Sequence, residues 1–329
     1  MTLILHIGAG KCGSSAIQSS LTQHANLERR DGSTVEYIAI DAKGLLVRGD
    51  HLRKSAGIGG YRTSPSTMAL KRMDLASIGK ALRDIKHDVL LSQEAWIYQA
   101  ENWRDILEQA GLDAHVFAYV RPHAPLLNSA WWQWGAWKDK PYEEWLMHRL
   151  KRSMWGARMR EWKSIPRVKS VTVRLLPDDV VADMYAYILE TDSPDTRPMV
   201  NSSLPSVILR LFQRNRELRP HAHASRIDFI LSEQLALPGS SPWVLAPELI
   251  EHILSETRED NVDLLSMLDS ESARIMREDA RWWDKAAFSD KVAESPDPVP
   301  IDPDALEKLC VALVKALDAP GKRDAIESA

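Results

Sequence analysis

The first 180 residues alternate between short apolar segments and longer segments with helical spacing, and this alternation restricts the fold more than any other feature. The apolar segments that we interpret as strands are residues 3–7, 35–40, 88–92, 115–120 and 171–175. Helical spacing of apolar residues is found in residues 16–24, 75–85 and 95–110. Strands that alternate with helices usually pair in parallel, because each connection crosses over the sheet. We therefore predict an α/β fold with a central parallel sheet covered by helices on both faces.

The rest of the chain has a different pattern. Beyond residue 201 it is mostly helical, and a proline-rich segment at residues 295–303 precedes one more helical stretch. We predict an α/β core at residues 1–180 and a helical elaboration at residues 181–294 that contributes to the substrate side. A stiff linker at 295–303 and a C-terminal helix and tail at 304–329 follow. Residues 44–67 have no periodicity and are predicted to be a long surface segment.

Charge and cysteine content restrict the binding partners and the cellular compartment that we expect for the protein. The net charge of −4 gives no general attraction to nucleic acid or to a membrane surface. Two cysteines, Cys12 and Cys310, cannot form a disulfide framework, which favours a reducing compartment. Residues 1–7 are too short for a signal peptide, and no apolar run approaches the length of a membrane span. We expect a cytoplasmic protein without a transmembrane segment.

Residues 8–15 form a glycine-rich loop, GAGKCGSS, between the first strand and the first helix. Such a loop offers free backbone N–H groups and the positive end of a helix, and both suit a phosphate. Lys11 adds a positive charge, and Ser14 and Ser15 add hydroxyl donors. Alternatively, the glycines only allow a tight corner. The loop differs from a Walker A motif because Ser14 stands where that motif has its lysine, which disfavours a nucleoside triphosphatase.

The loop resembles the 5′-phosphosulfate loop of sulfotransferases that use 3′-phosphoadenosine-5′-phosphosulfate (PAPS). The resemblance implies a P-loop-like three-layer sandwich in which Lys11 bridges the 5′-phosphate and the departing sulfonate. Gly13, Ser14 and Ser15 would surround the 5′-phosphate. Cys12 occupies a position that varies in the family, and we interpret it as a packing residue of the loop. The alternative is a reactive thiol, because a helix N-terminus lowers the pKa of a thiol.

A second signature of this family is an arginine at the end of a later strand, with a serine eight residues further on. Arg121 follows the apolar segment 115–120, and Ser129 lies eight residues beyond it. An arginine fork can bind a phosphate with two parallel hydrogen bonds, so these residues are predicted to hold the 3′-phosphate. Both signatures lie at carboxyl ends of strands, where open α/β sheets bind ligands. The resemblance covers about residues 1–180.

The resemblance also implies a catalytic base, a His or Glu after a strand between the two phosphate signatures. Glu94 has this position, 27 residues ahead of Arg121, as in the family branch that sulfates carbohydrates. In the alternative interpretation Ser92 caps a helix and Glu94 supports its first turn. His51 and His123 are rival candidates for the base.

Two further features leave their alternatives open. Seven of the twelve tryptophans lie between residues 131 and 162, and we favour a core role for most of them over stacking on a ligand. Residues 149–174 contain nine Lys or Arg and one acidic residue. Three interpretations of this basic stretch are open: the solvent-exposed face of a helix, a nucleic-acid site, or a source of positive potential that attracts an anionic donor or acceptor.

Together these patterns predict a PAPS-dependent sulfotransferase that acts without a metal on a hydroxyl, with a carbohydrate or glycolipid as the expected acceptor. The alternatives are a kinase-like P-loop phosphotransferase and a non-catalytic protein that binds a nucleotide or a glycan. We expect no nucleic-acid partner, and the sequence leaves the oligomeric state open.

Overall fold

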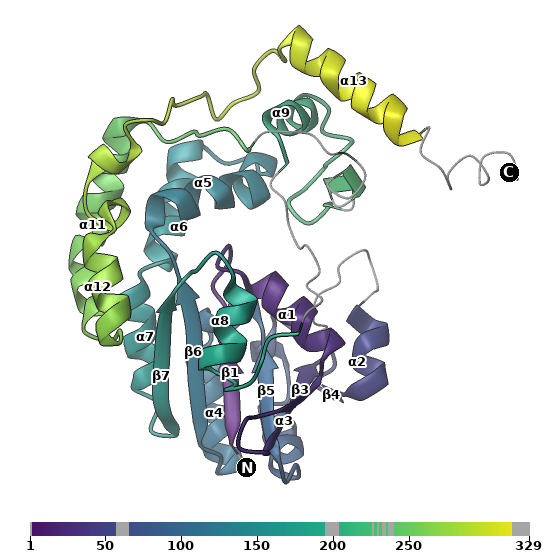
Figure 1. Ribbon diagram of the computed structural model, residues 1–329, viewed down its shortest axis with the longest axis vertical. Helices are drawn as coiled ribbons and strands as arrows, with labels where there is room; N and C mark the ends of the chain where they lie inside the picture. Colours follow the sequence, from purple (N-terminus) through teal and green to yellow (C-terminus); the bar gives the residue numbers. More distant parts are fainter. Residues whose placement is uncertain are drawn as a thin grey trace, which may run out of the picture.

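A computed structural model of the chain describes residues 2–56, 66–194, 204–225, 227, 228, 230, 231, 235 and 240–317. Its centre is a seven-stranded sheet in the order β2-β3-β5-β1-β6-β7, with β4 paired to β3 (Figure 1). The parallel strands are β1 (Leu3–His6), β3 (Thr34–Ile40), β5 (Asp88–Ser92), β6 (Ala114–Val120) and β7 (Val168–Leu175). The five predicted strands and the mostly parallel sheet are therefore confirmed.

Two short strands at one edge of the sheet were not predicted. β2 (Asn26–Glu28) and β4 (Leu46–Val47) both pair antiparallel with β3. They have three and two residues and are largely exposed or half-buried, so their sequences carry too little alternation to be recognised.

The segment at residues 44–67 also has more structure than we predicted. After β4 it forms helix α2 (Gly49–Ala56), while residues 57–65 lie outside the described part. A short 3-10 helix, η2 (Leu70–Arg72), follows.

Helices cover both faces of the sheet. α1 (Ser14–Gln23) packs against α8 (Val180–Tyr187), and α3 (Leu75–Arg83) packs against α4 (Ala100–Ala110). Figure 1 shows α1 and α8 in front of the strands and α4 behind them. The central strands are buried on both sides, which explains why β1 and β5 are apolar without alternation. Instead of one helix from residue 95, the chain forms a 3-10 helix, η3 (Glu94–Tyr98), before α4.

The remaining helices gather above the carboxyl edge of the sheet and beside β7 (Figure 1). They are α5 (His123–Trp134), η4 (Gly135–Trp137), α6 (Tyr142–Arg152), α7 (Trp155–Lys163), α9 (Ser206–Arg214), α11 (Pro247–Leu265), α12 (Ser270–Glu278), η5 (Ala280–Trp282), η6 (Lys285–Phe288) and α13 (Pro303–Leu317). Across the described ranges, every helix is too short or too polar to span a bilayer.

Two hydrophobic clusters make up the core. One lies around the sheet and also contains Leu264, Met276 and Trp282 from the C-terminal half. The other joins α5 and α6 to α9 and α11. Both clusters cross residue 180, so the proposed division there stays a prediction.

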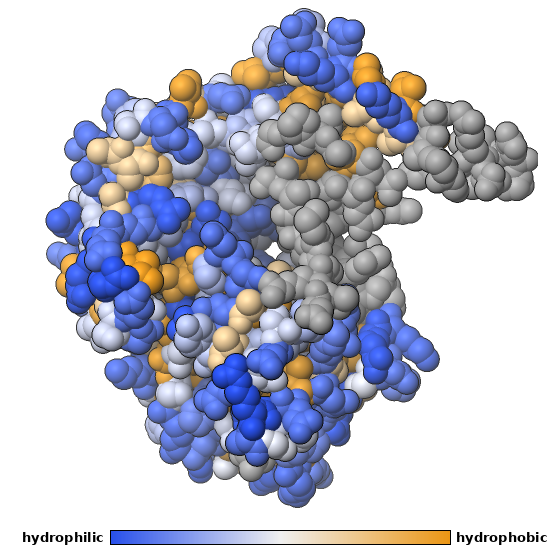
Figure 2. Space-filling view, viewed as in Figure 1, coloured by the Kyte–Doolittle hydropathy of each residue, from blue (hydrophilic) through white to orange (hydrophobic). Residues whose placement is uncertain are grey.

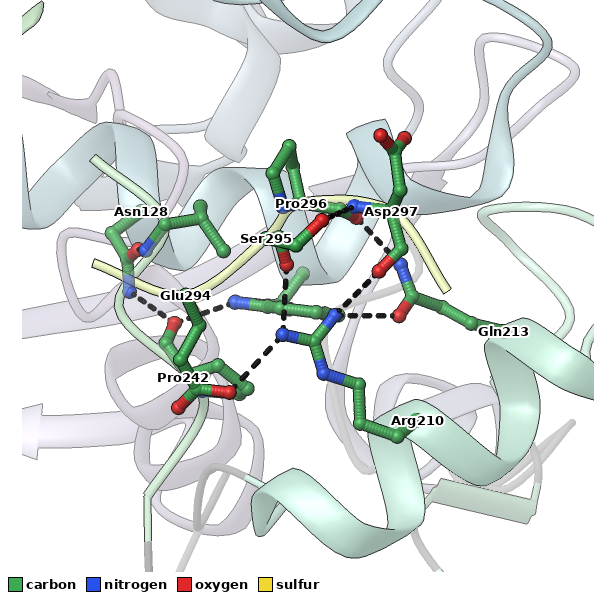
Figure 3. Close-up of polar contacts among 10 residues, drawn as sticks. Asn128, Arg210, Gln213, Pro242, Glu294, Ser295, Pro296 and Asp297 are labelled. Atoms are coloured by element: carbon green, nitrogen blue, oxygen red, sulfur yellow. Dashed lines mark hydrogen bonds and ion pairs between the residues drawn. The ribbon is translucent and has the colours of Figure 1, made fainter. Parts of the chain in front are cut away.

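The proline-rich segment has no regular structure, and its first residues are bonded to α9 (Figure 3). The buried Arg210 side chain donates to the carbonyl oxygens of Ser295 and Asp297 and pairs with Glu294. Gln213 donates to the carbonyl oxygen of Pro296. These bonds fix the start of the segment, while residues 318–329 of the predicted tail lie outside the described part.

The corner between β1 and α1 depends on Gly13. This residue precedes the helix with a φ of 81°, in the left-handed region. A Cβ atom at Gly13 would also lie 2.7 Å from a methyl group of Val180, at the start of α8. The position therefore excludes a side chain for two separate reasons.

Replacing Gly13 by Ala should destabilise the fold, and Gly32 offers a matched control. Gly32 has a φ of 82° but no atom within 4 Å of the place of its Cβ. Gly32→Ala should cost about 1–2 kcal/mol from backbone strain alone, and Gly13→Ala about 1–3 kcal/mol more from the clash. Urea unfolding measures both values. Val180→Ala in the Gly13→Ala background should recover part of the added cost, and equal losses at the two glycines would contradict the clash.

Candidate functional site

The carboxyl ends of three adjacent strands bring the predicted site residues together. β1 lies between β5 and β6, with His6 paired to Ser92 on one side and to Phe117 on the other. The glycine-rich loop leaves β1 at this point, Glu94 follows β5, and Arg121 follows β6. Arg121 Nη1 donates to the carbonyl oxygen of Lys11 at 3.3 Å, which joins the loop to the end of β6.

The loop presents free donors at the start of α1. The Cys12 N–H donates to Ala9 and closes a tight turn. Within the described residues, the backbone N–H groups of Gly13, Ser14 and Ser15 have no hydrogen-bond acceptor. Lys11 has a φ of 67°, a left-handed conformation that is uncommon outside glycine and costs roughly 1–2 kcal/mol. Strain of this kind gathers at functional sites, and here it accompanies donors suited to an anion.

Three side chains close over Gly10. A Cβ atom built on Gly10 would lie 2.7 Å from Trp134 Cη2, 2.8 Å from Glu94 Oε1 and 2.9 Å from Arg149 Nη2. The Arg149 guanidinium lies over the Trp134 ring, 4.7 Å from its centroid. Because Gly10 has no side chain, the Glu94 carboxylate after β5 and the Arg149 guanidinium of α6 can both approach the loop at this point.

Burial and opposite charge compete in this group. Burial raises the pKa of the Glu94 carboxyl, while the positive charges of Arg149 and Lys11 oppose the rise. Burial also lowers the pKa of the Lys11 ammonium, and the charge of Glu94 opposes that change. A carboxyl group with a raised pKa takes up a proton more readily than an exposed glutamate does.

A buried polar group lies directly beneath the loop. His6 Nδ1 and the Ser92 hydroxyl are 2.7 Å apart, and Gln18 donates to the same hydroxyl at 3.2 Å. Burial lowers the pKa of His6 to about 3, so its ring is neutral at physiological pH. Ser92 is the last residue of β5, and its hydroxyl is hydrogen-bonded to His6 on the neighbouring strand β1. Since Gln93 occupies the cap position of η3, the part of the alternative that made Ser92 the cap is wrong, but Glu94 does lie in the first turn of this 3-10 helix.

The remaining candidates have mixed outcomes. The Cys12 side chain is fully buried, and burial raises the pKa of its thiol to about 12, which contradicts a reactive thiol and agrees with packing. Ser129 is half-buried on α5, and its hydroxyl makes no hydrogen bond within the described residues. His51 is exposed on α2, which packs against α1 and β3.

His123 has a structural environment. It is buried, its Nε2 donates to the carbonyl oxygen of Ser153 at 2.6 Å, and its ring stacks on Trp155. Burial lowers the pKa of His123 to about 4. A neutral ring in these contacts is unsuited to act as the base.

The tryptophan cluster is mostly core, as predicted. Six of its seven members are buried, namely Trp131, Trp132, Trp137, Trp145, Trp155 and Trp162. Trp134 is the half-buried exception that reaches Gly10. Sequence reasoning missed both Trp134 and Arg149 as site residues. In the sequence, Trp134 is marked only as one of the clustered tryptophans, and Arg149 only as the first residue of the basic stretch.

The charge balance at Glu94 should appear in the stability of the protein. Because burial raises the pKa of Glu94 in the folded state, the ionised carboxylate weakens folding once the pH exceeds the value of the unfolded chain. Glu94→Gln should therefore melt at a higher temperature than the wild type at pH 8, and the difference should vanish near pH 4, where the carboxyl is neutral in both states. Thermal unfolding at the two pH values tests this.

The control for this experiment is Glu108→Gln, which removes an exposed carboxylate of α4. It should leave the melting temperature nearly unchanged at pH 8. A Glu94→Gln protein that is less stable than the wild type at pH 8 would mean that Arg149 and Lys11 outweigh the cost of burial.

No protein-family model matches the sequence, and no curated protein matches it. Among solved structures, the chain is similar to a crystal structure of a sulfotransferase from Alicyclobacillus acidocaldarius. The match has 12% sequence identity and a TM-score of 0.39, and it covers 82% of this chain and 98% of the other. A likeness of this size carries no argument about activity.

Proposed function

We propose that this protein is a sulfotransferase that moves a sulfonate from PAPS to a hydroxyl of a carbohydrate or glycolipid. The observation that supports this most is that Glu94 and Arg149 both approach Gly10, the residue before Lys11, while Arg121 is bonded to the same loop. This group offers cations for a phosphosulfate and a base for an acceptor at one edge of the sheet.

In this proposal PAPS spans the site, with its 5′-phosphate at the start of α1 and its 3′-phosphate at Arg121 and Ser129. The free N–H groups of Gly13, Ser14 and Ser15 hold the 5′-phosphate at the start of α1. Lys11 lies between this phosphate and the sulfonate, and Arg121 and Ser129 hold the 3′-phosphate. The fork of an arginine suits this second phosphate because it can donate two parallel hydrogen bonds.

The reaction is an in-line displacement at sulfur. The acceptor oxygen attacks the sulfur, and the bond from sulfur to the 5′-phosphate oxygen breaks. The acceptor proton passes to the Glu94 carboxylate, and 3′-phosphoadenosine-5′-phosphate (PAP) leaves. Lys11 and the loop N–H groups stabilise the negative charge that develops on the leaving phosphate.

Arg149 and Trp134 support the base in this scheme. Arg149 attracts the Glu94 carboxylate and keeps more of it ionised than burial alone would allow. The Trp134 ring beneath the guanidinium restricts where Arg149 can lie. These residues come from α5 and α6, so the helical layer completes a site that begins on the sheet.

The first test of the proposal is nucleotide selectivity. PAP should bind far more tightly than AMP in calorimetry without added Mg²⁺, because AMP lacks the 3′-phosphate. Arg121→Ala should cost about 1.5–3 kcal/mol of PAP affinity, the usual range for hydrogen bonds to charged groups, and should leave AMP affinity nearly unchanged. Equal affinities of the wild type for PAP and AMP would remove the 3′-phosphate site, and tighter binding of Mg-ATP would favour a phosphotransferase.

The second test separates the base from its supporting charge. Glu94→Gln should lower sulfonate transfer by roughly 10²–10⁴, the usual contribution of a positioned base. Arg149→Met should retain more activity, but the acid limb of its pH profile should move to higher pH, because Glu94 loses a charge that favours its ionised form. Lys151→Met, which removes an exposed cation from the same helix, should leave the limb in place. Near-normal turnover of Glu94→Gln would exclude this base.

A further inference from the structure

A groove lies beside the candidate site. It has a volume of about 880 Å³ and is bordered by η2, η3, the first turns of α4, the end of α6 and α7. Its lining is rich in polar side chains that can both donate and accept hydrogen bonds. The residues with charged or polar side chains that line it are Lys71, Arg72, Tyr98, Gln99, Glu101, Asn102, Arg104, Arg152, Arg158, Glu161 and Ser164.

The groove concentrates positive charge on a chain with a net charge of −4. Five of its lining residues are cations and two are carboxylates. Arg158 uses both oxygens of Glu161 and is thereby neutralised. The other four cations, Lys71, Arg72, Arg104 and Arg152, form no ion pair within the described residues. A surface that keeps four cations unpaired around one hollow is suited to an anion.

Tyr98 arranges the arginines at the inner end of the groove. The guanidinium of Arg152 lies 4.2 Å from the centroid of the Tyr98 ring, and that of Arg158 lies 5.8 Å from it. Contacts of this kind hold a flexible side chain in place and reduce the entropy lost when a ligand binds. The same contacts occupy the ring, so it is poorly placed to stack on a base.

The groove and the candidate site share two structural elements. Ala95 and Tyr98 line the groove from η3, the 3-10 helix that begins at Glu94. Arg152 lines it from α6, one helical turn after Arg149. The elements that carry Glu94 and Arg149 therefore also line the groove.

We propose that this groove binds the acidic part of an oligosaccharide acceptor, one that carries carboxylate or sulfate groups along its chain. The role of this oligosaccharide as a sulfonate acceptor rests on the proposed function, whereas its binding to the groove does not. The unpaired cations would hold the acidic groups, while the Glu101 carboxylate and the Asn102 carbonyl oxygen accept from sugar hydroxyls. A nucleic acid fits less well, because its bases would find the Tyr98 ring already covered by arginines.

Binding of matched oligosaccharides to the full chain tests the inference. The probes are a fluorescently labelled galacturonic acid hexamer, the neutral galactose hexamer and a single-stranded dT12, compared by fluorescence anisotropy at fixed ionic strength. We expect the acidic hexamer to bind at least tenfold more tightly than either of the others. Arg72→Gln combined with Arg104→Gln should weaken its binding tenfold or more, with the thermal melt unchanged, since neither residue holds the Tyr98 contacts.

The control is a double variant with the same loss of charge elsewhere. Arg83→Gln with Arg277→Gln removes two exposed arginines from α3 and α12, outside the groove, and should leave binding within about twofold of the wild type. Equal weakening by the two double variants would mean general charge attraction and would overturn the inference. Tighter binding of dT12, or no preference for the acidic hexamer, would overturn it as well.

Failure of this inference can be separated from failure of the proposed function. Groove-dependent binding of the acidic hexamer without PAP binding would support the groove and contradict the sulfotransferase. Sulfonate transfer to neutral glycans alone, unaffected by Arg72→Gln with Arg104→Gln, would support the enzyme and overturn the groove. If the protein transfers sulfonate to acidic glycans, and Arg72→Gln with Arg104→Gln raises the KM for them tenfold at similar kcat, both the groove and the sulfotransferase would be supported.

Discussion

The pairing of β1 between β5 and β6 determines the geometry of the site. All three strands run in the same direction, so the segments that follow them emerge at one edge of the sheet. The first of these segments is the glycine-rich loop, the second begins with Glu94, and the third with Arg121. Their sequence separations are large, yet the register of His6 with Ser92 and with Phe117 brings them to the same edge of the sheet. A slip in this register would move Glu94 and Arg121 away from the loop.

Charge at this edge is maintained against the cost of burial. A carboxylate and two cations lie close together, and burial disfavours the ionised form of both Glu94 and Lys11. Their mutual attraction recovers part of this cost, and removing one partner would leave the others less compensated. The same conflict is useful for chemistry, because it gives Glu94 a proton affinity above that of an exposed glutamate. Burial of these charges therefore costs stability at this edge of the sheet.

The parts of this structure that follow from local sequence were predictable, and those that depend on packing between distant segments were not. The five parallel strands and the positions of Lys11, Glu94 and Arg121 at strand ends follow from apolar runs and from chain order. Arg149 and Trp134 were missed because each lies in a helix whose orientation depends on contacts beyond its own sequence. The short strands β2 and β4 were missed because two or three residues carry no period.

The helical half determines where Arg149 lies, and buried polar contacts fix that position. His123, at the start of α5, holds the turn between α6 and α7 by donating to the Ser153 carbonyl oxygen. On the far side of that turn, the Asp260 carboxylate of α11 accepts from the N–H groups of Gly156 and Ala157 at the start of α7. A carboxylate at a helix N-terminus satisfies donors that would otherwise be unpaired, so α11 and α7 are joined firmly. The end of α6 is thus anchored from α5 and from the α7–α11 contact, and Arg149 lies one turn before that end. Residues of α11, far along the chain from the loop, therefore help to position the Arg149 guanidinium near Gly10.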